Sequence, residues 1–515
     1  MTPTTSPGLF SLVLHSHLPW LANHGRWPVG EEWLYQSWAA SYLPVVKVLK
    51  DLAAQGHSHV LSLGITPVLA AQLDDPHCLA GMHHWLGNWQ LRAHEAALMP
   101  DEPHRELGKR EHRLAAAALE DFETHWRHGA APVLRELIDA GTIELLGGPL
   151  AHPFQPLLDP RMRAFSLSEG LADAKIRWGS TPTGIWAPEC GFSPGMETQY
   201  EAAGIRHFMV DGPSLRGDTS LGRPVWNSDV VAFGRDLQVS YRVWSPKSGY
   251  PGHSAYRDFH TYDHATGLKA VRVTGRKVAG ENKAPYEPEL AAKAVRKHVA
   301  DFVDVVRKRL ASEYERTGRP AHVVAAFDTE LFGHWWHEGP QWLGEVLQAL
   351  PEAGVEVGTL EDARQRGYVG EPVELPASSW GSGKDWRVWA GDQVADLVEL
   401  NEDVVSVALE TVDKARETGG SGVELRDRVN DQLLREALLA VSSDWAFMVS
   451  KDSAAGYARD RAHLHSHAVR EIAEAVGSGQ VARAGRLAAG WGKADGLFPG
   501  LDARRLPSRD AVATV

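Results

Sequence analysis

The sequence predicts an α/β protein in which a parallel-stranded barrel is followed by an all-α C-terminal part. Three observations support this. Short apolar runs alternate with longer amphipathic segments over the first two-thirds of the 515 residues. Each apolar run ends in a polar, Gly-rich or Pro-rich turn. Beyond a boundary near residues 367–376, the periodicity is that of helices.

Seven apolar runs are candidate strands. They cover residues 9–15, 60–63, 143–147, 183–186, 206–210, 323–327 and 355–360. Helical patterns lie between them, such as 292–310, where Val295, Val299 and Phe302 share one face. Seven strands favour a barrel over an open sheet. In barrels the loops that follow the strands build the active site, so the strand ends are the places to search.

The catalytic part is expected over residues 1–370, with two insertions. The first, about 75–135, is rich in His, Glu, Ala and Arg and indicates a helical pair. The second, about 212–288, is rich in Gly, Pro, Tyr and Arg and indicates a long irregular segment, which is often functional. The helical part covers 371–515, with helices expected over 394–417, 425–441, 455–476 and 482–490.

The composition excludes several classes of function. A net charge of −13 without long like-charge runs disfavours nucleic acid and anionic membranes as partners. Cys78 and Cys190 are too few for a disulfide framework or a thiolate zinc site. We see no secretory signal and no run of about 18 apolar residues, so a cytoplasmic protein is expected. The 19 tryptophans exceed what core packing alone requires, and indole faces are natural platforms for sugar rings.

Histidines follow two of the candidate strands. HSHLPW places His15 and His17 two residues apart, on one face of an extended chain. They could bind a metal, donate hydrogen bonds to sugar hydroxyls, or be structural. ELLGGPLAHPF places His152 after two glycines, where it is as compatible with a turn as with a ligand site.

Carboxylates follow two other strands. GIWAPECGF places Glu189 at a strand end near Trp186, and partial desolvation there would tune it for catalysis, although a capping or ion-pairing role is the alternative. AAFDTELFGHWWHEG delivers Asp328 to the next such end, followed by His334 and Trp335. Two carboxyl groups facing each other across a cleft are what glycosidic chemistry requires.

The helical part adds aromatic and acidic candidates. SSWGSGKDWRVW places Trp380 and Trp389 in a Gly- and Ser-rich loop, where stacking on sugars is at least as plausible as packing. SSDWAFMV places Asp444 within a helical pattern, where burial against the barrel is the alternative.

Eight segments, in order, resemble family 57 of the glycoside hydrolases, and within it the 1,4-α-glucan branching enzymes. They are HSHLPW, HGRWPVGEEW, GIWAPECGF, VAFGRD, VWSPKSGYPG, AAFDTELFGHWWHEG, SSWGSGKDW and SSDWAF, and they span nearly the whole chain. The resemblance implies an incomplete (β/α)7 barrel followed by a helical domain that helps to form the glucan cleft. It also implies a retaining mechanism without metal or organic cofactor.

The resemblance also implies roles for individual residues. Glu189 matches the nucleophile and Asp328 the acid/base. Among the substrate-binding candidates, three histidines match positions that hold the sugar and three tryptophans match the cleft lining: His15, His17, His152, Trp27, Trp380 and Trp389. The family's branching enzymes exclude water with a tyrosine on a mobile loop. Tyr250 is the first candidate for this residue and Tyr256 the second.

The leading hypothesis is therefore a branching enzyme acting on glycogen, amylose or a modified intracellular α-glucan. A family 57 α-amylase or 4-α-glucanotransferase would use the same site. A metal-dependent hydrolase or deacetylase with His15, His17 and Asp328 as ligands is a less favoured alternative. A glucan-binding protein without catalysis is disfavoured by the intact pair of Glu189 and Asp328.

Overall fold

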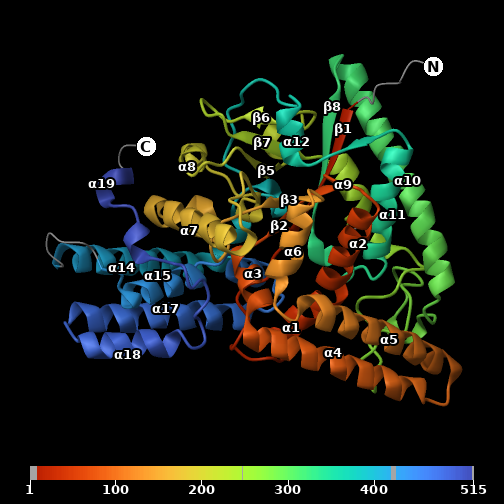
Figure 1. The fold of residues 1–515 in the computed structure, drawn as a ribbon, viewed down its shortest axis with the longest axis horizontal. Helices are drawn as coiled ribbons and strands as arrows, with labels where there is room; N and C mark the ends of the chain where they lie inside the picture. Colours follow the sequence, from red (N-terminus) through yellow and green to blue (C-terminus); the bar gives the residue numbers. More distant parts are fainter. Residues whose placement is uncertain (1–7, 246–247, 419–424, 513–515) are drawn as a thin grey trace.

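The computed structural model describes residues 8–245, 248–418 and 425–512, which form a mixed α/β region and a helical C-terminal region (Figure 1). One sheet has the order β3-β2-β1-β8, with β9 beside the start of β1, and a second has the order β4-β5-β7-β6. Neighbouring strands are parallel except β6 and β7. The strands are β1 Gly8–Ser16, β2 Leu61–Ile65, β3 Ile143–Leu146, β4 Gly184–Ile185, β5 His207–Asp211, β6 Arg223–Pro224, β7 Val231–Arg235, β8 Ala321–Asp328 and β9 Glu356–Val357.

The two sheets are joined at both sides. Gly147, directly after β3, forms a parallel bridge with Ile185 of β4. On the other side, the backbone N–H of Asp236, after β7, donates to the carbonyl of Val324 in β8 over 2.8 Å. The register of β1 and β8 pairs His15 with Asp328, so these two sequence-predicted residues lie side by side at the strand ends.

The expectation for residues 212–288 requires a correction. This range contains β6, β7 and helix α9, and β7 pairs in parallel with β5 through its whole length. The apolar run over 230–233 is fully buried, but Gly- and Pro-rich neighbours hide it in the sequence. Conversely, the run at 355–360 supplies only the two-residue strand β9, because the chain turns into helix α12 at Leu360.

Helices cover the strands on their outer side (Figure 1). In α10, Phe302 on the apolar face packs edge-on against Phe10 of β1, with ring centroids 5.9 Å apart. The helices of this region are α1 Glu31–Ser37, α2 Leu43–Ala54, α3 Pro67–Asp74, α6 Ala130–Asp139, α7 Pro160–Trp178, α8 Met196–Ala202, α9 Leu237–Val243, α10 Pro288–Thr317, α11 Gly339–Glu352 and α12 Leu360–Gln365.

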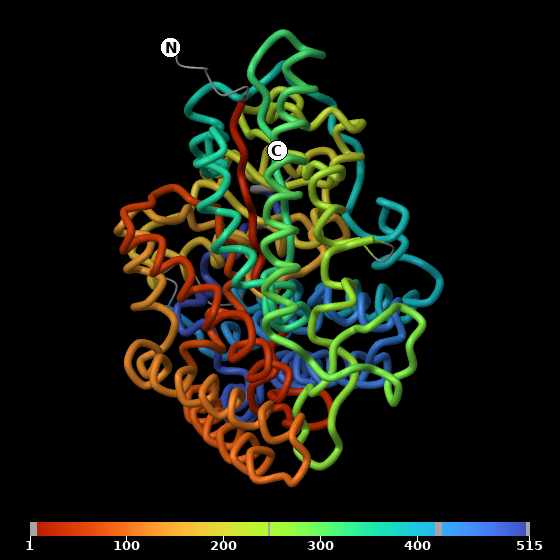
Figure 2. The backbone as a smooth tube through the Cα atoms, turned by 90° about the vertical axis from the view of Figure 1, so that its right-hand side faces the viewer, coloured from red at the N-terminus to blue at the C-terminus, as the bar shows by residue number. Residues whose placement is uncertain are grey.

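A helical hairpin formed by α4 (Pro76–Ala97) and α5 (Glu102–Asp121) occupies the expected first insertion. In Figure 2 the hairpin lies at the lower end of the molecule, and the chain around residues 255–285 reaches down beside it. The contact is specific: the Arg257 guanidinium donates to Glu111 over 2.9 Å, and Leu268 packs with Ala96 and Leu107.

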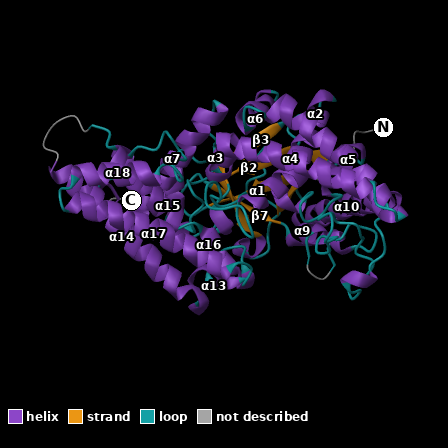
Figure 3. Cartoon of the chain, turned by 90° about the horizontal axis from the view of Figure 1, so that it is seen from below, coloured by secondary structure: helices purple, strands orange, loops and turns teal. Residues whose placement is uncertain are grey.

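The C-terminal helices gather to one side of the strands (Figure 3). They are α13 Arg387–Ala390, α14 Ala395–Thr418, α15 Arg428–Ala440, α16 Ser443–Ser450, α17 Ala455–Gly477, α18 Val481–Trp491 and α19 Arg509–Val512. Helix α15 is buried from Asn430 to Ala440 and forms the centre of this group. Among the described residues, no helix combines the length and apolar character that crossing a membrane requires.

Candidate active site

Glu189 lies directly after β4, in a short 3-10 turn, Pro188–Cys190. Its side chain is 8% exposed, and both carboxylate oxygens accept hydrogen bonds. Ser443 Oγ donates to one over 2.8 Å, and Trp380 Nε1 donates to the other over 2.8 Å. Burial raises the pKa of Glu189 to about 7, although these two donors oppose the shift.

A chain of hydrogen bonds leads from β1 to this carboxylate. Because Ser443 donates to Glu189, its oxygen accepts from His152 Nδ1, 2.9 Å away. The other nitrogen of His152, Nε2, then accepts from His15 Nε2 over 3.2 Å. This assignment requires a neutral His152 protonated at Nδ1 and a His15 protonated at Nε2. Burial, with smaller contributions from neighbouring charges, holds the pKa of both histidines well below the ordinary value, which fits.

His17 is paired with Asp444. Burial alone would lower its pKa, but the Asp444 carboxylate, 2.8 Å from His17 Nε2, raises it above the ordinary value. Burial likewise opposes ionisation of Asp444, and His17 lowers the pKa of Asp444 below its usual range. The ring of His17 also stacks on His152, with centroids 3.7 Å apart. The contact with Asp444 therefore holds His17 among the site's carboxylates and favours its protonated form.

Asp328 and Glu330 follow β8. Burial raises the pKa of Asp328 to about 6, although the positive charges of Arg235 and His17 oppose this shift. Glu330 accepts from Tyr42 Oη over 2.5 Å and from the backbone N–H of His17 over 3.2 Å. Burial, reinforced by the charge of Asp328, raises the pKa of Glu330 to about 8. Three carboxyl groups with raised pKa values thus share one end of the strands.

Arg235, at the end of β7, is held by an ion-pair network. Its Nε donates to Asp211 over 2.8 Å, and Lys384 Nζ lies 2.6 Å from the other oxygen of that carboxylate. The guanidinium carbon lies 5.2 Å from the centre of the Trp380 ring. Since Lys384 also donates to the Trp380 carbonyl over 2.9 Å, the network fixes the indole that bonds Glu189.

The backbone at the site is strained at two places. Glu189 and Cys190 have φ of 60° and 50°, and Ala151 and His152 have φ of 56° and 54°. Non-glycine residues pay roughly 1–2 kcal/mol each for the left-handed conformation. Such outliers persist only where the surroundings fix them, and here they orient Glu189 and the histidine that supports Ser443.

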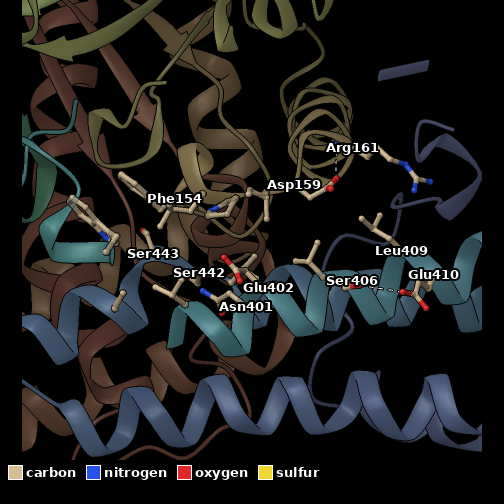
Figure 4. A pocket seen from close by; sticks show the side chains of 18 of the residues that line it. Phe154, Asp159, Arg161, Asn401, Glu402, Ser406, Leu409, Glu410, Ser442 and Ser443 are labelled. Atoms are coloured by element: carbon tan, nitrogen blue, oxygen red, sulfur yellow. Dashed lines mark hydrogen bonds between the residues drawn. The ribbon is translucent and has the colours of Figure 1, made fainter. Parts of the chain in front are cut away.

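A cavity of about 430 Å³ lies behind Ser443, between the 153–161 segment and the C-terminal helices (Figure 4). Asn401 and Glu402 of α14 form one wall. Trp389 lines the cavity but is only 2% exposed, with its ring stacked on Phe154 at 4.6 Å. Trp389 is therefore mainly a packing residue, and not the open cleft-lining aromatic that the sequence indicates.

Tyr250, the first candidate for the water-excluding residue, is packed against α10 in this structure. The side chain is 5% exposed, stacks on His298 at 4.2 Å, and donates its hydroxyl to Asp301 of α10 over 2.5 Å. Tyr256, the second candidate, is fully buried, with its hydroxyl 2.7 Å from His298 Nδ1. Both tyrosines anchor the loop to α10, so neither is placed to cover a sugar.

The remaining sequence-predicted residues divide into three groups. Trp186 is buried and stacks on His15 at 4.4 Å, so it supports that ring from behind. His334 and Trp335 line a second, larger cavity beside the α4–α5 hairpin. Trp27 is 75% exposed on the loop before α1. The structure thus brings together His15, His17, His152, Glu189, Asp328, Trp380 and Asp444, and leaves Trp27 and Tyr250 outside this group.

Sequence reasoning did not select Ser443, Glu330 or Arg235 as site residues. Arg235 could have been found, because it ends an apolar run in the same way as Asp328. Ser443 could not, since it is 254 residues from Glu189 and resembles any serine at a helix start.

One group in the site has the donor atoms of a metal ligand set: His17, His152 and Asp444. Each imidazole nitrogen of these two histidines already lies within 3.2 Å of a protein partner. A metal would have to displace the ion pair of His17 with Asp444, so the residues fit a hydrogen-bonded sugar site better than a metal site.

Buried strand-end carboxylates of this kind are typical of enzymes that act on glycosidic bonds. The model of glycosyl hydrolase family 57 matches residues 11–375, and the model of the C-terminal part of 1,4-alpha-glucan branching enzyme matches residues 402–505. The chain belongs to glycosyl hydrolase family 57.

Its relatives include branching enzymes. A probable 1,4-alpha-glucan branching enzyme of Mycobacterium tuberculosis is 68% identical over 517 residues, which cover 97% of this chain and 98% of that protein. The crystal structure of a family 57 branching enzyme from Thermococcus kodakaraensis, in complex with glucose and additives, superposes with a TM-score of 0.90 at 27% identity, covering 98% and 97% of the two chains. That of a family 57 branching enzyme from Pyrococcus horikoshii gives 0.89 at 28%, covering 98% of each.

Proposed function

We propose that this chain is a 1,4-α-glucan branching enzyme, which cleaves an α-1,4 glucan and rejoins the cleaved segment through an α-1,6 link. The matches to family 57, to the branching-enzyme C-terminal part and to a relative at 68% identity support the assignment. The observation that carries the chemistry is the Glu189 carboxylate, bonded at both oxygens and linked through Ser443 and His152 to His15, which lies beside Asp328.

The proposed architecture is an incomplete seven-stranded barrel. The circuit β1-β2-β3-β4-β5-β7-β8 returns to β1, and the joints at Gly147–Ile185 and Asp236–Val324 support closure. Residues 1–370 form the catalytic domain and 371–515 the helical domain in this proposal. The second domain contributes to the cleft, since Trp380, Ser443 and Asp444 contact site residues of the first.

In the first half-reaction, a Glu189 oxygen attacks the anomeric carbon C1 of the donor while Asp328 protonates the departing glycosidic oxygen O4. The C1–O4 bond breaks, a glycosyl ester forms on Glu189, and the reducing-end fragment leaves with the proton. The pKa values of the two acids lie close together, so we assign the roles from hydrogen bonding. Two fixed donors suit Glu189 to be the carboxylate, whereas Asp328 borders Glu330 and is available to carry the proton.

In the second half-reaction, the O6 hydroxyl of an acceptor chain attacks C1. Asp328 takes the hydroxyl proton, the C1–O6 bond forms, and the ester bond breaks to restore the Glu189 carboxylate. Both steps balance with the two carboxyl groups alone. His15, His152, His17 and Asp444 are proposed to bind the hydroxyls of the reacting sugar and to keep the nucleophile oriented.

Incubation of the purified protein with linear amylose, followed by treatment with an α-1,6-specific debranching enzyme, tests this proposal. We expect new branches that the debranching enzyme removes. Shortened linear chains without branches would assign α-amylase activity. Redistributed linear chain lengths without branches would assign 4-α-glucanotransferase activity. Either result would overturn the proposed function.

A further inference from the structure

The largest described cavity lies beside the α4–α5 hairpin and is not used by the steps above. Its volume is about 810 Å³. Four segments far apart in the sequence enclose it: the hairpin itself, the 32–47 segment after β1, the 257–269 segment, and the 333–340 segment after β8. Three of these segments also approach each other in Figure 2, at the lower end of the molecule.

Aromatic faces line this cavity while their polar edges are tied to the protein. Trp85 Nε1 donates to Glu32 over 2.7 Å, and Trp89 Nε1 donates to Glu111 over 3.2 Å. Trp335 lies on the opposite wall and stacks on the half-exposed Trp244 with centroids 5.8 Å apart. Three indoles thus line the cavity, and aromatic rings are the side chains on which sugar rings stack.

The charge of the lining favours a neutral ligand. Among the described residues that line the cavity, five are Lys or Arg and five are Asp or Glu. Several are already paired, for example Arg257 with Glu111 at 2.9 Å. An anionic ligand such as a nucleotide or lipid phosphate would meet as many acids as bases, whereas a neutral polyhydroxylated chain could bond to both.

A single segment of the chain, residues 330–335, lies between the cavity and the carboxyl groups of Asp328 and Glu330. The backbone N–H of Trp335 donates to the carbonyl of Glu330 over 3.1 Å, so the same loop faces both places. Gly333 packs so closely on the Ala40 carbonyl that an added Cβ would lie 1.7 Å from that oxygen. Tyr42, two residues on from Ala40, bonds Glu330. The wall of the cavity and the Glu330 side of the reaction centre are therefore one rigid unit.

We propose that this cavity binds the acceptor glucan of the branching reaction. The inference rests on the proposed function and extends it, because transfer requires a second neutral α-glucan whose O6 hydroxyl reaches the glycosyl ester on Glu189. Since Glu189, Asp328 and Glu330 are not among the described residues that line the cavity, the cavity would hold a stretch of the acceptor chain remote from its reacting O6. Attack by O6 forms C1–O6, releases Glu189 as a carboxylate and gives the O6 proton to Asp328.

The decisive variant fills the cavity without removing a contact. Ala117 is exposed on α5 and lines the cavity, so Ala117→Trp places an indole inside it. Ala116 is the preceding residue of the same helix and is not among the described residues that line the cavity, so Ala116→Trp is the matched control. Trp85→Ala removes one platform, and Trp85→Phe restores a flat ring.

The assay supplies amylose as donor and a fluorescently labelled maltoheptaose as acceptor, and measures α-1,6 transfer to the label against acceptor concentration. For Ala117→Trp and Trp85→Ala we expect the acceptor KM to rise at least about fivefold and the ratio of branching to hydrolysis to fall. Ala116→Trp should match the parent, and Trp85→Phe should recover most of the loss. Circular dichroism and thermal melting check that every variant is folded.

Two outcomes would overturn the inference, and they are distinguishable. If the parent branches amylose and folded Ala117→Trp keeps the parental acceptor KM, the acceptor site lies elsewhere while the proposed function stands. If the parent forms no α-1,6 links at all, both the function and the acceptor site are wrong.

Discussion

Removal of the Ser443 hydroxyl is the perturbation that tests the site's geometry most selectively. In Ser443→Ala, Glu189 loses a 2.8 Å hydrogen bond and His152 loses its 2.9 Å partner, while Trp380 still bonds the other Glu189 oxygen. Hydrogen bonds to charged groups contribute about 1.5–3 kcal/mol. If the bond is at full strength when Glu189 departs as a carboxylate, the second half-reaction, measured as kcat/KM for the acceptor, should slow about 10- to 150-fold.

The variant should also change the pH dependence. The Ser443 hydrogen bond lowers the pKa of Glu189, so its loss raises that pKa. The reactive form combines an ionised Glu189 with a protonated Asp328, and the pKa of Glu189, about 7, already lies above that of Asp328, about 6. The change therefore shrinks the reactive fraction and moves the alkaline limb of kcat/KM for the donor to higher pH. The assay is the rate of branch formation on amylose from pH 4 to 10. Ser450→Ala is the control, since it removes a hydroxyl from the same helix that donates to the Val388 carbonyl and accepts from Gln393, and that has no bond to Glu189 among the described contacts. A folded Ser443→Ala protein with a parental acceptor kcat/KM and an unmoved alkaline limb would refute the reasoning.

Three further predictions follow from the same structure. The parental kcat/KM should peak between about pH 6 and pH 7. Below this range Glu189 is protonated and cannot attack, and above it Asp328 has lost the proton that it must donate. An activity plateau extending to pH 9 would contradict this. Trp389→Ala should lower the free energy of unfolding by about 3–5 kcal/mol, because it empties a buried site, and urea denaturation should show a much smaller loss for the half-exposed Trp226→Ala. Tyr250→Phe should lower the free energy of unfolding by about 1–2 kcal/mol, because the bond to Asp301 is lost. The ratio of branching to hydrolysis should stay at the parental value. A clear rise in hydrolysis would instead assign Tyr250 the role of excluding water from the site.

Most strands and the candidate carboxylates could be predicted because their signals are local. An apolar run that ends abruptly in an acid is visible at Asp328, and the strand does end there. The C-terminal helices were equally visible from their periodicity. Strand β7 has the same kind of run, but surrounding Gly and Pro residues made the whole range look irregular.

What could not be predicted depends on partners distant in sequence. Tyr250 lies in a Gly- and Pro-rich segment that suits a lid, yet its position is decided by Asp301 and His298 on α10. Ser443 acquires its role only because α16 begins beside Glu189. Trp389 resembles a sugar platform in the sequence, and only the position of Phe154 shows that its face is covered.

The most direct test of the central claim is to trap the glycosyl-enzyme. Asp328→Asn, incubated with an α-maltosyl fluoride whose leaving group needs no proton, should accumulate an ester that breaks down slowly. Peptide mass spectrometry should then find one maltosyl group on the peptide that contains Glu189, and none in the double variant with Glu189→Gln. A label on Glu330, or an equal label in the double variant, would contradict the assignment of Glu189 as the nucleophile.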